Sequence, residues 1–321
     1  MKTILNLLTG YARNAEECVS YVPHNGAKYV EFTCLYPSIG RLMFNWEKTY
    51  FNNVGYKVFE FISSDSLLAS VLPSIVVCIY LMAIFAGRRY MRDRAAWQWK
   101  KQLAVWNLCL SLFSFMGMIR MLPPLIHNMN TLSLRENMCG DPYGSFIAGS
   151  TGTWVQFFIL SKFPELIDTF FIVIHKKPLI FLHWYHHITV LLYVWHGSYA
   201  VMNPVSPVFG AMNYTVHAMM YGYYFLMAIK KKPNWMNPML ITTAQIMQMV
   251  AGIVATSVGV YYYVENQFAM QEGKENSCTI RAQSLVAAIL MYGSYLVLFM
   301  QFFAKRFMKP TDFIRPQKKL V

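Results

Sequence analysis

The sequence predicts an all-α integral membrane protein with seven transmembrane helices. The chain of 321 residues is 56% hydrophobic and 13% charged, whereas soluble domains carry about 25% charged residues. Apolar runs of about 20 residues, the length that crosses a bilayer, recur along the chain. Lysine and arginine gather between alternate runs, which is typical of loops on the cytoplasmic side of a membrane.

The seven expected spans are apolar segments bounded by charges or by turns. They cover roughly 66–87, 102–122, 150–174, 179–199, 206–229, 238–263 and 282–304. The third and fourth are separated only by HKKP at 175–178. Pro73, Pro123–Pro124 and Pro207 are expected at bends or ends, because proline removes a helical hydrogen bond. The run after Met1 is too short for a signal peptide, so we expect insertion through a true span.

The distribution of basic residues orients these spans. The loop 87–101, the pairs and triplets at 176–177 and 230–232, and the tail after 304 lie on one side if there are seven spans. The positive-inside rule places that side in the cytoplasm and the N-terminus outside. We therefore expect an N-terminal lumenal region at 1–64, a membrane domain at 65–306 and a cytoplasmic tail at 307–321. The net charge of +13 follows from this topology and indicates no nucleic-acid partner.

Six cysteines agree with this arrangement. Cys78 and Cys109 fall within spans and are expected to pack in the core. Cys139 and Cys278 fall in two loops on the non-cytoplasmic side, where an oxidising lumen allows them to pair. Cys18 and Cys34 are possible competitors for that disulfide.

Ionisable residues inside spans are rare and usually functional. The third span contains Lys162, Glu165 and Asp168 at a spacing of three, which predicts one helical face. The fourth contains the three histidines of HWYHH, namely His183, His186 and His187. Asp168 lies seven residues before the HKKP turn and His186 eight after it. At ~1.5 Å per residue, both lie at about the same depth, so a carboxylate and an imidazole are expected to meet.

The fifth and sixth spans add further polar side chains at a similar depth. These are Asn213, His217, Met220, Tyr221, Tyr223 and Tyr224 in the fifth, and Thr242, Gln245 and Gln248 in the sixth. Four helices are thus expected to build one buried polar site. The alternative is a purely structural network of interhelical hydrogen bonds. It accounts for the glutamines and tyrosines better than for the histidines and charged residues.

Two chemistries suit such a histidine cluster. Membrane di-iron enzymes use HxxHH boxes because neutral imidazole binds iron well, but they need about eight histidines. Here only His183, His186, His187 and His217 are expected to converge, too few for two irons, although a single zinc remains open. The other chemistry is metal-free acyl transfer, in which imidazole acts as a nucleophile and proton carrier.

Four motifs favour the second chemistry. KFPELIDTFF, HWYHH, NYTVHAMMYGYY and TTAQIMQ occur in this order. They resemble KxxExxDT, HxxHH, NxxxHxxMYxYY and TxxQxxQ of the ELO family of very-long-chain fatty acid elongases. The resemblance covers about 65–306 and leaves the N-terminal sixty residues outside. It implies a seven-span enzyme of the endoplasmic reticulum membrane, with helices two to seven enclosing an acyl tunnel.

The activity implied by this resemblance is the condensation of acyl-CoA with malonyl-CoA to 3-ketoacyl-CoA, with release of CO2 and CoA. No metal or cofactor is expected, and malonyl-CoA is the co-substrate. The expected partners are membrane lipid and the ketoreductase, dehydratase and enoyl reductase of the elongation cycle. Alternatives are a di-iron desaturase or hydroxylase, and a seven-helix transporter or receptor without enzymatic activity.

Roles follow for individual residues. We hypothesise that His186 forms an acyl-imidazole. Asp168 is expected to hold and polarise a histidine, and His217 to move a proton. His183 and His187 complete the catalytic set. The residues expected to bind substrate are Lys162, Glu165, Asn213, Tyr221, Tyr224, Gln245, Gln248, Lys176 and Lys177. The two lysines, with those at 230–232, rim the cytoplasmic entrance, where CoA phosphates would lie.

Two further expectations concern specificity and location. HWYHH, with tryptophan at position 184, resembles the corresponding motif in the branch of the family that acts on saturated and monounsaturated chains. This resemblance favours a straight C14–C18 acyl group. The chain ends in KKLV, and Lys318 and Lys319 resemble a dilysine retrieval signal read on the cytoplasmic face.

Overall fold

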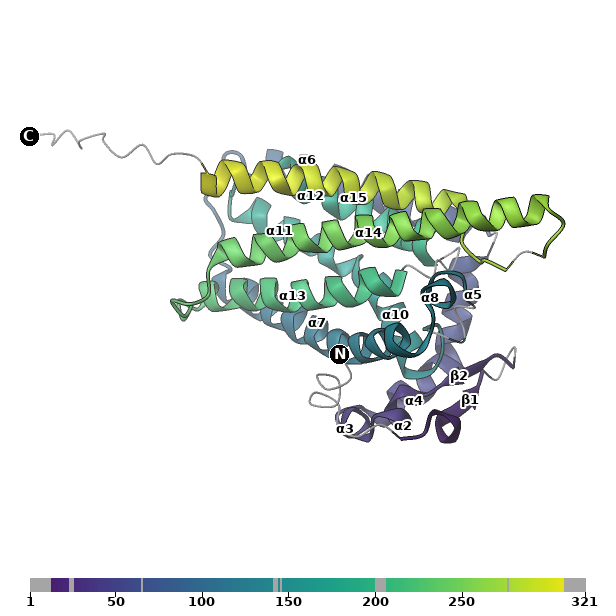
Figure 1. The fold of residues 1–321 in the computed structure, drawn as a ribbon. Coiled ribbons are helices and arrows are strands. Elements are labelled where there is room, and N and C mark those ends of the chain that lie inside the picture. The colour runs from purple at the N-terminus through teal and green to yellow at the C-terminus, as the bar shows by residue number, and fades with distance from the viewer. Residues whose placement is uncertain are drawn as a thin grey trace, which may run out of the picture.

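Long helices packed side by side form most of the molecule, which is a computed structural model (Figure 1). The structure describes residues 13–22, 26–64, 66–140, 144, 146–199, 206–275 and 277–308. The helices in the expected membrane domain are α6 (Leu67–Met91), α7 (Lys100–Thr131), α8 (Leu134–Cys139), α10 (Gly149–Ser161), η3 (Pro164–Leu166), α11 (Ile167–Ile174), α12 (Phe181–Leu192), η4 (Tyr193–Tyr199), α13 (Ser206–Ala228), α14 (Pro238–Gln271), α15 (Ala282–Phe303) and η5 (Ala304–Met308).

The region before α6 contains short elements that lie at one end of the bundle, next to α10 (Figure 1). They are η1 (Ala15–Cys18), β1 (Val19–Tyr21), β2 (Lys28–Val30), α2 (Phe32–Leu35), α3 (Pro37–Gly40), α4 (Asn45–Tyr50), η2 (Phe51–Gly55) and α5 (Tyr56–Ser63). The strands β1 and β2 pair antiparallel, with Val19 opposite Val30. This small hairpin is the only β-sheet in the described part of the chain.

Helix occupies all seven of the ranges in which spans were expected. Within the described residues, four helices are long and apolar enough to cross a membrane, namely Leu67–Met91, Lys100–Thr131, Pro238–Gln271 and Ala282–Met308. The third range is broken into α10, η3 and α11, and the fourth changes from α12 to the π-helical η4. The all-α membrane class is therefore confirmed, whereas the count of seven spans and the tunnel stay predictions.

The second helix of the membrane domain is longer than the span expected at 102–122. Instead of ending near Pro123–Pro124, α7 continues through both prolines to Thr131. A proline removes one helical hydrogen bond but does not prevent continuation where neighbouring packing holds the helix. Both prolines are buried, and Met121 beside them belongs to the main core. Tertiary packing therefore overrides the local stop signal.

Two glycines allow neighbouring helices to approach closely. A Cβ atom added at Gly117 on α7 would lie 2.4 Å from the ring of Tyr214 on α13. At Gly252 on α14, the same atom would lie 2.3 Å from the ring of Tyr292 on α15. Each glycine therefore accommodates a buried tyrosine of the next helix, and this fixes the spacing of α7 against α13 and of α14 against α15.

The main hydrophobic core joins the N-terminal region to the helical bundle. Phe51, Phe59 and Ile62 are at most 2% exposed and belong to the same cluster as Trp154 and Tyr292. Residues from η2 and α5 therefore pack into the core that the long helices build. The boundary expected at 64 separates two parts of the sequence but not two separate cores.

Two disulfides are present. The expected bridge between Cys139 and Cys278 is confirmed, and it joins the end of α8 to the segment before α15. Cys18 and Cys34, named as competitors, instead pair with each other and close the N-terminal hairpin onto α2. Cys78 and Cys109 are free and exposed, so the expectation that they pack in the core is wrong. Cys78 on α6 and Cys109 on α7 therefore lie on faces of these helices that do not pack against other parts of the described chain.

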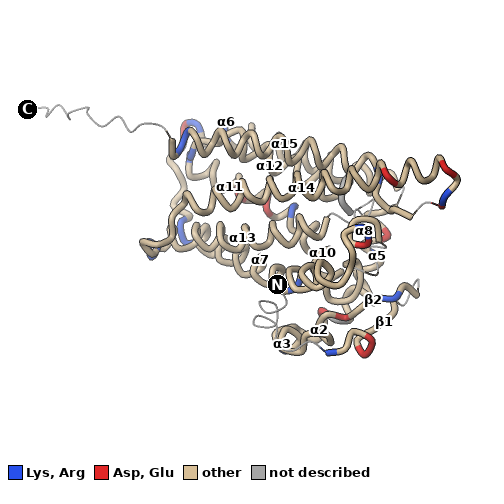
Figure 2. Tube along the Cα trace, in the orientation of Figure 1, with Lys and Arg blue, Asp and Glu red and all other residues tan. Residues whose placement is uncertain are grey.

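The surface of the helices fits a bilayer. Several large apolar side chains of α6 are more than 45% exposed, among them Leu67, Ile75, Ile79, Met82 and Phe85. Figure 2 shows that lysine and arginine gather at the end of the bundle where α6 and α13 finish. The dilysine pair Lys318 and Lys319 lies outside the described residues.

Candidate active site

The residues of the four motifs come from four parts of the chain. His183, His186 and His187 lie on α12, and Asn213 and His217 lie on α13. Lys162 and Glu165 lie between α10 and α11, and Gln245 and Gln248 lie on α14. Positions i, i+3 and i+4 share one face of a helix, which places the three histidines of α12 together. His183 and His187 have ring centroids 4.5 Å apart, and His186 and His187 5.5 Å apart.

The helix that carries the acidic motif is not continuous, in contrast to the expectation for 150–174. It ends at Ser161, and a short 3₁₀ turn begins at Pro164 before the chain becomes α-helical again at Ile167. Pro164 has no N–H to donate to the preceding turn, so the helix tightens there. Lys162 and Glu165 lie on either side of Pro164 and form an ion pair at a spacing of three residues.

Lys162, Glu165, Asn213 and His217 form a buried polar network. Lys162 Nζ donates to Glu165 Oε1 at 2.7 Å and to Asn213 Oδ1 at 3.2 Å. The amide nitrogen of Asn213 lies 3.2 Å from His217 Nε2. His217 Nδ1 lies 4.0 Å from Glu165 Oε2. All four residues are at most 7% exposed, and a charge buried this deeply requires such partners.

Asp168 has partners other than the expected histidine. Its carboxylate accepts hydrogen bonds from Trp106 Nε1 at 2.6 Å and from Tyr221 OH at 2.6 Å. The carboxylate nearest to a histidine is that of Glu165, beside His217. The two carboxylates lie three residues apart, but Glu165 faces the imidazole of His217 and Asp168 does not. Asp168 instead holds Tyr221, a residue of the NxxxHxxMYxYY motif.

The ring of His186 is held on one side by α15. It packs against the ring of Tyr295, with centroids 5.1 Å apart, and Tyr295 OH donates to the His186 carbonyl at 3.1 Å. Thr189 shares that hydroxyl at 2.6 Å. Among the described residues, none forms a hydrogen bond to the His186 imidazole nitrogens, so packing positions this ring and leaves its nitrogens available to a substrate.

Several of these partners could not be found from the motifs. Trp106 is on α7, Tyr295 on α15 and Thr169 on α11, where its hydroxyl lies 2.9 Å from His183 Nε2. Thr169 carries a usable signal, because it follows Asp168 within the first motif. Trp106 and Tyr295 carry none, since aromatic side chains are common in every span of this chain.

The predicted substrate-binding residues divide into two groups. Lys162, Glu165, Asn213 and Tyr221 belong to the buried cluster described above. The side-chain nitrogen of Gln245 lies 3.4 Å from Met220 Sδ. Tyr224 is 46% exposed. Their contribution to substrate binding stays a prediction.

Three buried polar atoms of the motifs have no hydrogen-bond partner among the described residues. They are Glu165 Oε2, His187 Nδ1 and Gln248 Nε2. An unpaired polar atom is costly in a buried site, about 1–3 kcal/mol each. Such atoms are usual where a site is built to receive a polar group of a ligand.

The lysines at the end of the bundle are placed less favourably for phosphate binding than expected. Lys176 Nζ donates to the carbonyl groups of Arg92 and Arg94, at 3.0 Å each. It therefore ties the loop after α6 to the turn after α11. Lys177 is exposed. A role for the pair in binding CoA stays a prediction.

Metal binding has little support in the same geometry. In the part of the chain that the structure describes, no three His, Cys, Asp or Glu side chains are grouped so that they could hold a metal ion. The di-iron alternative therefore has no ligand set among these residues. The expectation of a metal-free site stays a prediction.

The chain is similar to known proteins over most of its length. The model of the ELO: GNS1/SUR4 family matches residues 67–313. Very long chain fatty acid elongase 6 of Drosophila melanogaster is 42% identical over 234 residues, which cover 72% of this chain and 71% of that protein. Elongase 6 of Gallus gallus is 40% identical over 73% of this chain and 83% of its own. Elongase 3 of Homo sapiens is 38% identical over 73% of this chain and 82% of its own.

Proposed function

The chain belongs to the ELO: GNS1/SUR4 family, and we propose that it is the condensing enzyme of fatty acid elongation. In this reaction, acyl-CoA and malonyl-CoA give 3-ketoacyl-CoA, CO2 and CoA. The relatives are named very long chain fatty acid elongases. The observation that carries the proposal is the buried network of Lys162, Glu165, Asn213 and His217, which joins the first motif to the third.

The first half-reaction assigns His186 as the nucleophile. A nitrogen of its imidazole attacks the thioester carbonyl, the C–S bond breaks, and the CoA thiolate takes up the proton that the imidazole loses and leaves as a thiol. The acyl group stays on the imidazole nitrogen. Tyr295 and Thr189 support this role because they hold the His186 backbone and ring without occupying its nitrogens. The cluster contains several histidines, so one imidazole can act as the nucleophile and another can carry the proton.

In the second half-reaction, the malonyl group loses CO2, and its electron pair attacks the acyl carbonyl. The bond to the imidazole then breaks, the imidazole nitrogen takes up the one proton that the overall reaction consumes, and 3-ketoacyl-CoA is released. Negative charge develops on the thioester oxygen of the malonyl-derived enolate. Lys162 supplies a buried positive charge, and Asn213 has a second amide hydrogen that can donate to the substrate. His217 is assigned to move the proton; Glu165 faces its Nδ1, and the amide nitrogen of Asn213 lies 3.2 Å from its Nε2.

Acylation of the protein by acyl-CoA alone tests this proposal. Intact-protein mass spectrometry should show a single acyl adduct before malonyl-CoA is added, and the kinetics should be ping-pong. His186→Ala should lose the adduct. His175→Ala is the matched control, because His175 lies at the end of α11 and its ring bonds the carbonyl of Phe171. Product formation with sequential kinetics and no adduct would overturn the covalent step.

The same assay distinguishes the other functions. A desaturase or hydroxylase would require iron and an electron donor and would not consume malonyl-CoA. A transporter or receptor would bind ligand without forming 3-ketoacyl products. Failure to detect 3-ketoacyl-CoA from acyl-CoA and radiolabelled malonyl-CoA would overturn the proposed condensation altogether.

For the acyl group we propose a straight saturated chain of C14–C18. The resemblance of HWYHH to the branch acting on saturated and monounsaturated chains supports this choice, and the relatives include elongases 3 and 6. Trp184 packs against Phe181 at the start of α12, with ring centroids 5.0 Å apart. Competition between palmitoyl-CoA and a polyunsaturated C18 or C20 acyl-CoA tests this. A preference for the polyunsaturated substrate would refute it.

We further propose that the enzyme resides in the endoplasmic reticulum membrane, with its N-terminus in the lumen and its tail in the cytoplasm. The gathering of basic residues at one end of the bundle supports this orientation (Figure 2), as do the two disulfides at 18–34 and 139–278. The reductase and dehydratase enzymes that process 3-ketoacyl-CoA are the partners that this product requires. Protease protection of an epitope placed at each terminus tests the orientation.

A further inference from the structure

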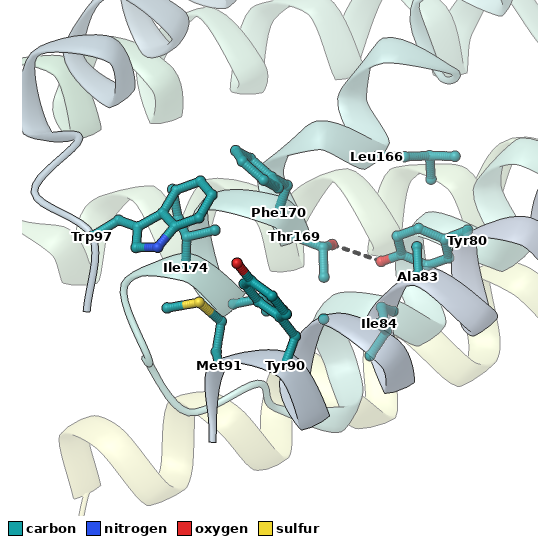
Figure 3. Close-up of a pocket in the computed structure, with 12 residues that line it drawn as sticks. Tyr80, Ala83, Ile84, Tyr90, Met91, Trp97, Leu166, Thr169, Phe170 and Ile174 are labelled. Carbon is teal, nitrogen blue, oxygen red and sulfur yellow. Dashed lines mark hydrogen bonds between the residues drawn. The ribbon is translucent and has the colours of Figure 1, made fainter. Parts of the chain in front are cut away.

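A cavity of about 180 Å³ lies between α6 and α11, and its walls are almost entirely apolar (Figure 3). Ile84, Trp97, Phe170 and Ile174 supply much of the lining. Tyr80 and Tyr90, both on α6, also line it. None of the four motifs lies on α6, so its side chains were not expected to affect the active site.

Tyr80 connects this cavity to the histidines. Its hydroxyl lies 2.7 Å from Thr169 Oγ1, as the dashed line in Figure 3 shows. The same Thr169 oxygen lies 2.9 Å from His183 Nε2. Tyr80 is 6% exposed and Thr169 2%. Three polar groups from three helices thus form one chain, which is buried at Tyr80 and Thr169 and ends on the half-buried first histidine of HWYHH.

The direction of the hydrogen bonds follows from counting donors. Among the described residues, Thr169 is the only hydrogen-bond partner of the Tyr80 hydroxyl, which otherwise faces apolar side chains. A buried O–H without an acceptor is costly, so Tyr80 donates to Thr169. The hydrogen of Thr169 then has only His183 Nε2 as an acceptor. A neutral imidazole that accepts at Nε2 carries its proton on Nδ1.

We propose that Tyr80 is a positioning residue: through Thr169 it holds the His183 imidazole in the tautomer protonated at Nδ1 and in one orientation. His183 in turn packs edge-on against His187, and His187 against His186. A His183 ring free to rotate or change tautomer would leave the ring of the proposed nucleophile less constrained. This role rests on the proposed acyl transfer and deepens it, because it assigns a function to a helix outside the motifs.

Substitution of Tyr80 tests the role, with Tyr90 as the matched control. Tyr80→Phe removes only the donor hydroxyl, and kcat should fall roughly three- to tenfold, as expected for the loss of one neutral hydrogen bond. The KM for acyl-CoA should not change, because no substrate contact is removed. Tyr90→Phe removes a hydroxyl from the same cavity that has no link to Thr169 and should leave kcat unchanged. Equal kcat values for the two variants would overturn the proposal.

A double-mutant cycle separates positioning from mere packing. Thr169→Val should lower kcat at least as much as Tyr80→Phe, and Thr169→Ser, which keeps the hydroxyl, should restore most of it. Because Tyr80 acts through Thr169, adding Tyr80→Phe to Thr169→Val should cause no further loss. An additive loss would mean that Tyr80 acts independently and would refute the chain of contacts.

Nitrogen-15 NMR of histidine-labelled protein provides a measurement that does not depend on turnover. The His183 signals, assigned by difference from His183→Gln, should report protonation at Nδ1 in the unsubstituted protein. Tyr80→Phe should introduce the other tautomer, and Tyr90→Phe should not. Protonation at Nε2 in the unsubstituted protein would overturn the proposal. An absence of condensing activity, by contrast, would count against the proposed function, while the spectra would still decide the role of Tyr80.

Discussion

Glu47 and Arg120 form a bidentate ion pair that joins the N-terminal region to α7. Arg120 Nε donates to Glu47 Oε2 at 2.6 Å and Nη2 to Oε1 at 2.7 Å, while Trp154 Nε1 donates to the same Oε2 at 2.6 Å. Glu47 is 0% and Arg120 3% exposed. Neither residue belongs to the four motifs, so this contact shows how the segment before the resemblance is held on the bundle.

Removing one member of this pair should destabilise the protein strongly. Glu47→Gln leaves the Arg120 guanidinium buried without its counter-charge, and we expect a loss of about 3–5 kcal/mol. Thermal unfolding in detergent should show a much lower Tm for Glu47→Gln. Glu60→Gln on the exposed face of α5 is the control and should change Tm little. Equal Tm values for both variants would contradict a role for the pair in docking the N-terminal region.

Breaking the buried ion pair of the site should lower kcat more than breaking an exposed ion pair. Glu165→Gln should lower kcat at least tenfold, because Lys162 and His217 lose the carboxylate that orients them. Glu265→Gln breaks an ion pair with Arg135 whose side chains are 37% and 45% exposed, and such pairs contribute little. Steady-state kinetics and Tm of the two variants are compared. Full activity of Glu165→Gln would remove this carboxylate from the mechanism.

Glycine substitutions should show where helix spacing controls activity. Gly117→Ala places a Cβ atom against the Tyr214 ring, so α7 and α13 must separate, and α13 carries Asn213 and His217. We expect a lower Tm and reduced kcat. Gly293→Ala on α15 meets nothing within 4 Å and should be neutral or stabilising by up to about 1 kcal/mol, because alanine favours helix. A harmless Gly117→Ala would mean that the two helices adjust without cost.

The cysteine pairing is open to direct mapping. Peptide analysis without reduction should find Cys18 linked to Cys34 and Cys139 linked to Cys278, with Cys78 and Cys109 as thiols. Cys139→Ser should cost about 2–4 kcal/mol of stability. Cys109→Ser is the control and should leave stability unchanged. Recovery of Cys139 as a free thiol from native membranes would contradict the structure and the proposed orientation.

The tail prediction concerns residues outside the described part of the chain. Changing Lys318 and Lys319 together to serine should allow a tagged protein to reach later compartments of the secretory pathway. The control changes Lys305 and Arg306, which lie in η5, and should retain the reticular pattern. Fluorescence microscopy against compartment markers provides the measurement. Unchanged localisation of the dilysine variant would mean that another segment retains the protein.

The membrane class and the family could be predicted from the sequence, and the motifs indicated candidate site residues, whose roles stay predictions. Apolar length and charge distribution are local properties, and they predicted membrane helices because the bilayer acts on each segment separately. Helical periodicity placed His183, His186 and His187 on one face, since i, i+3 and i+4 are neighbours in any α-helix. Counting residues from the HKKP turn correctly brought the acidic motif to the level of the histidines.

The tertiary structure alone decided which side chains touch. Asp168 binds Tyr221 and Trp106, not a histidine, and the carboxylate beside His217 is that of Glu165. The links from Tyr80 to Thr169 and from Glu47 to Arg120 join helices whose relative rotation no local pattern specifies. The depth of a residue in the membrane can be predicted by counting along one helix. A hydrogen bond within 3 Å depends on how several helices pack against one another.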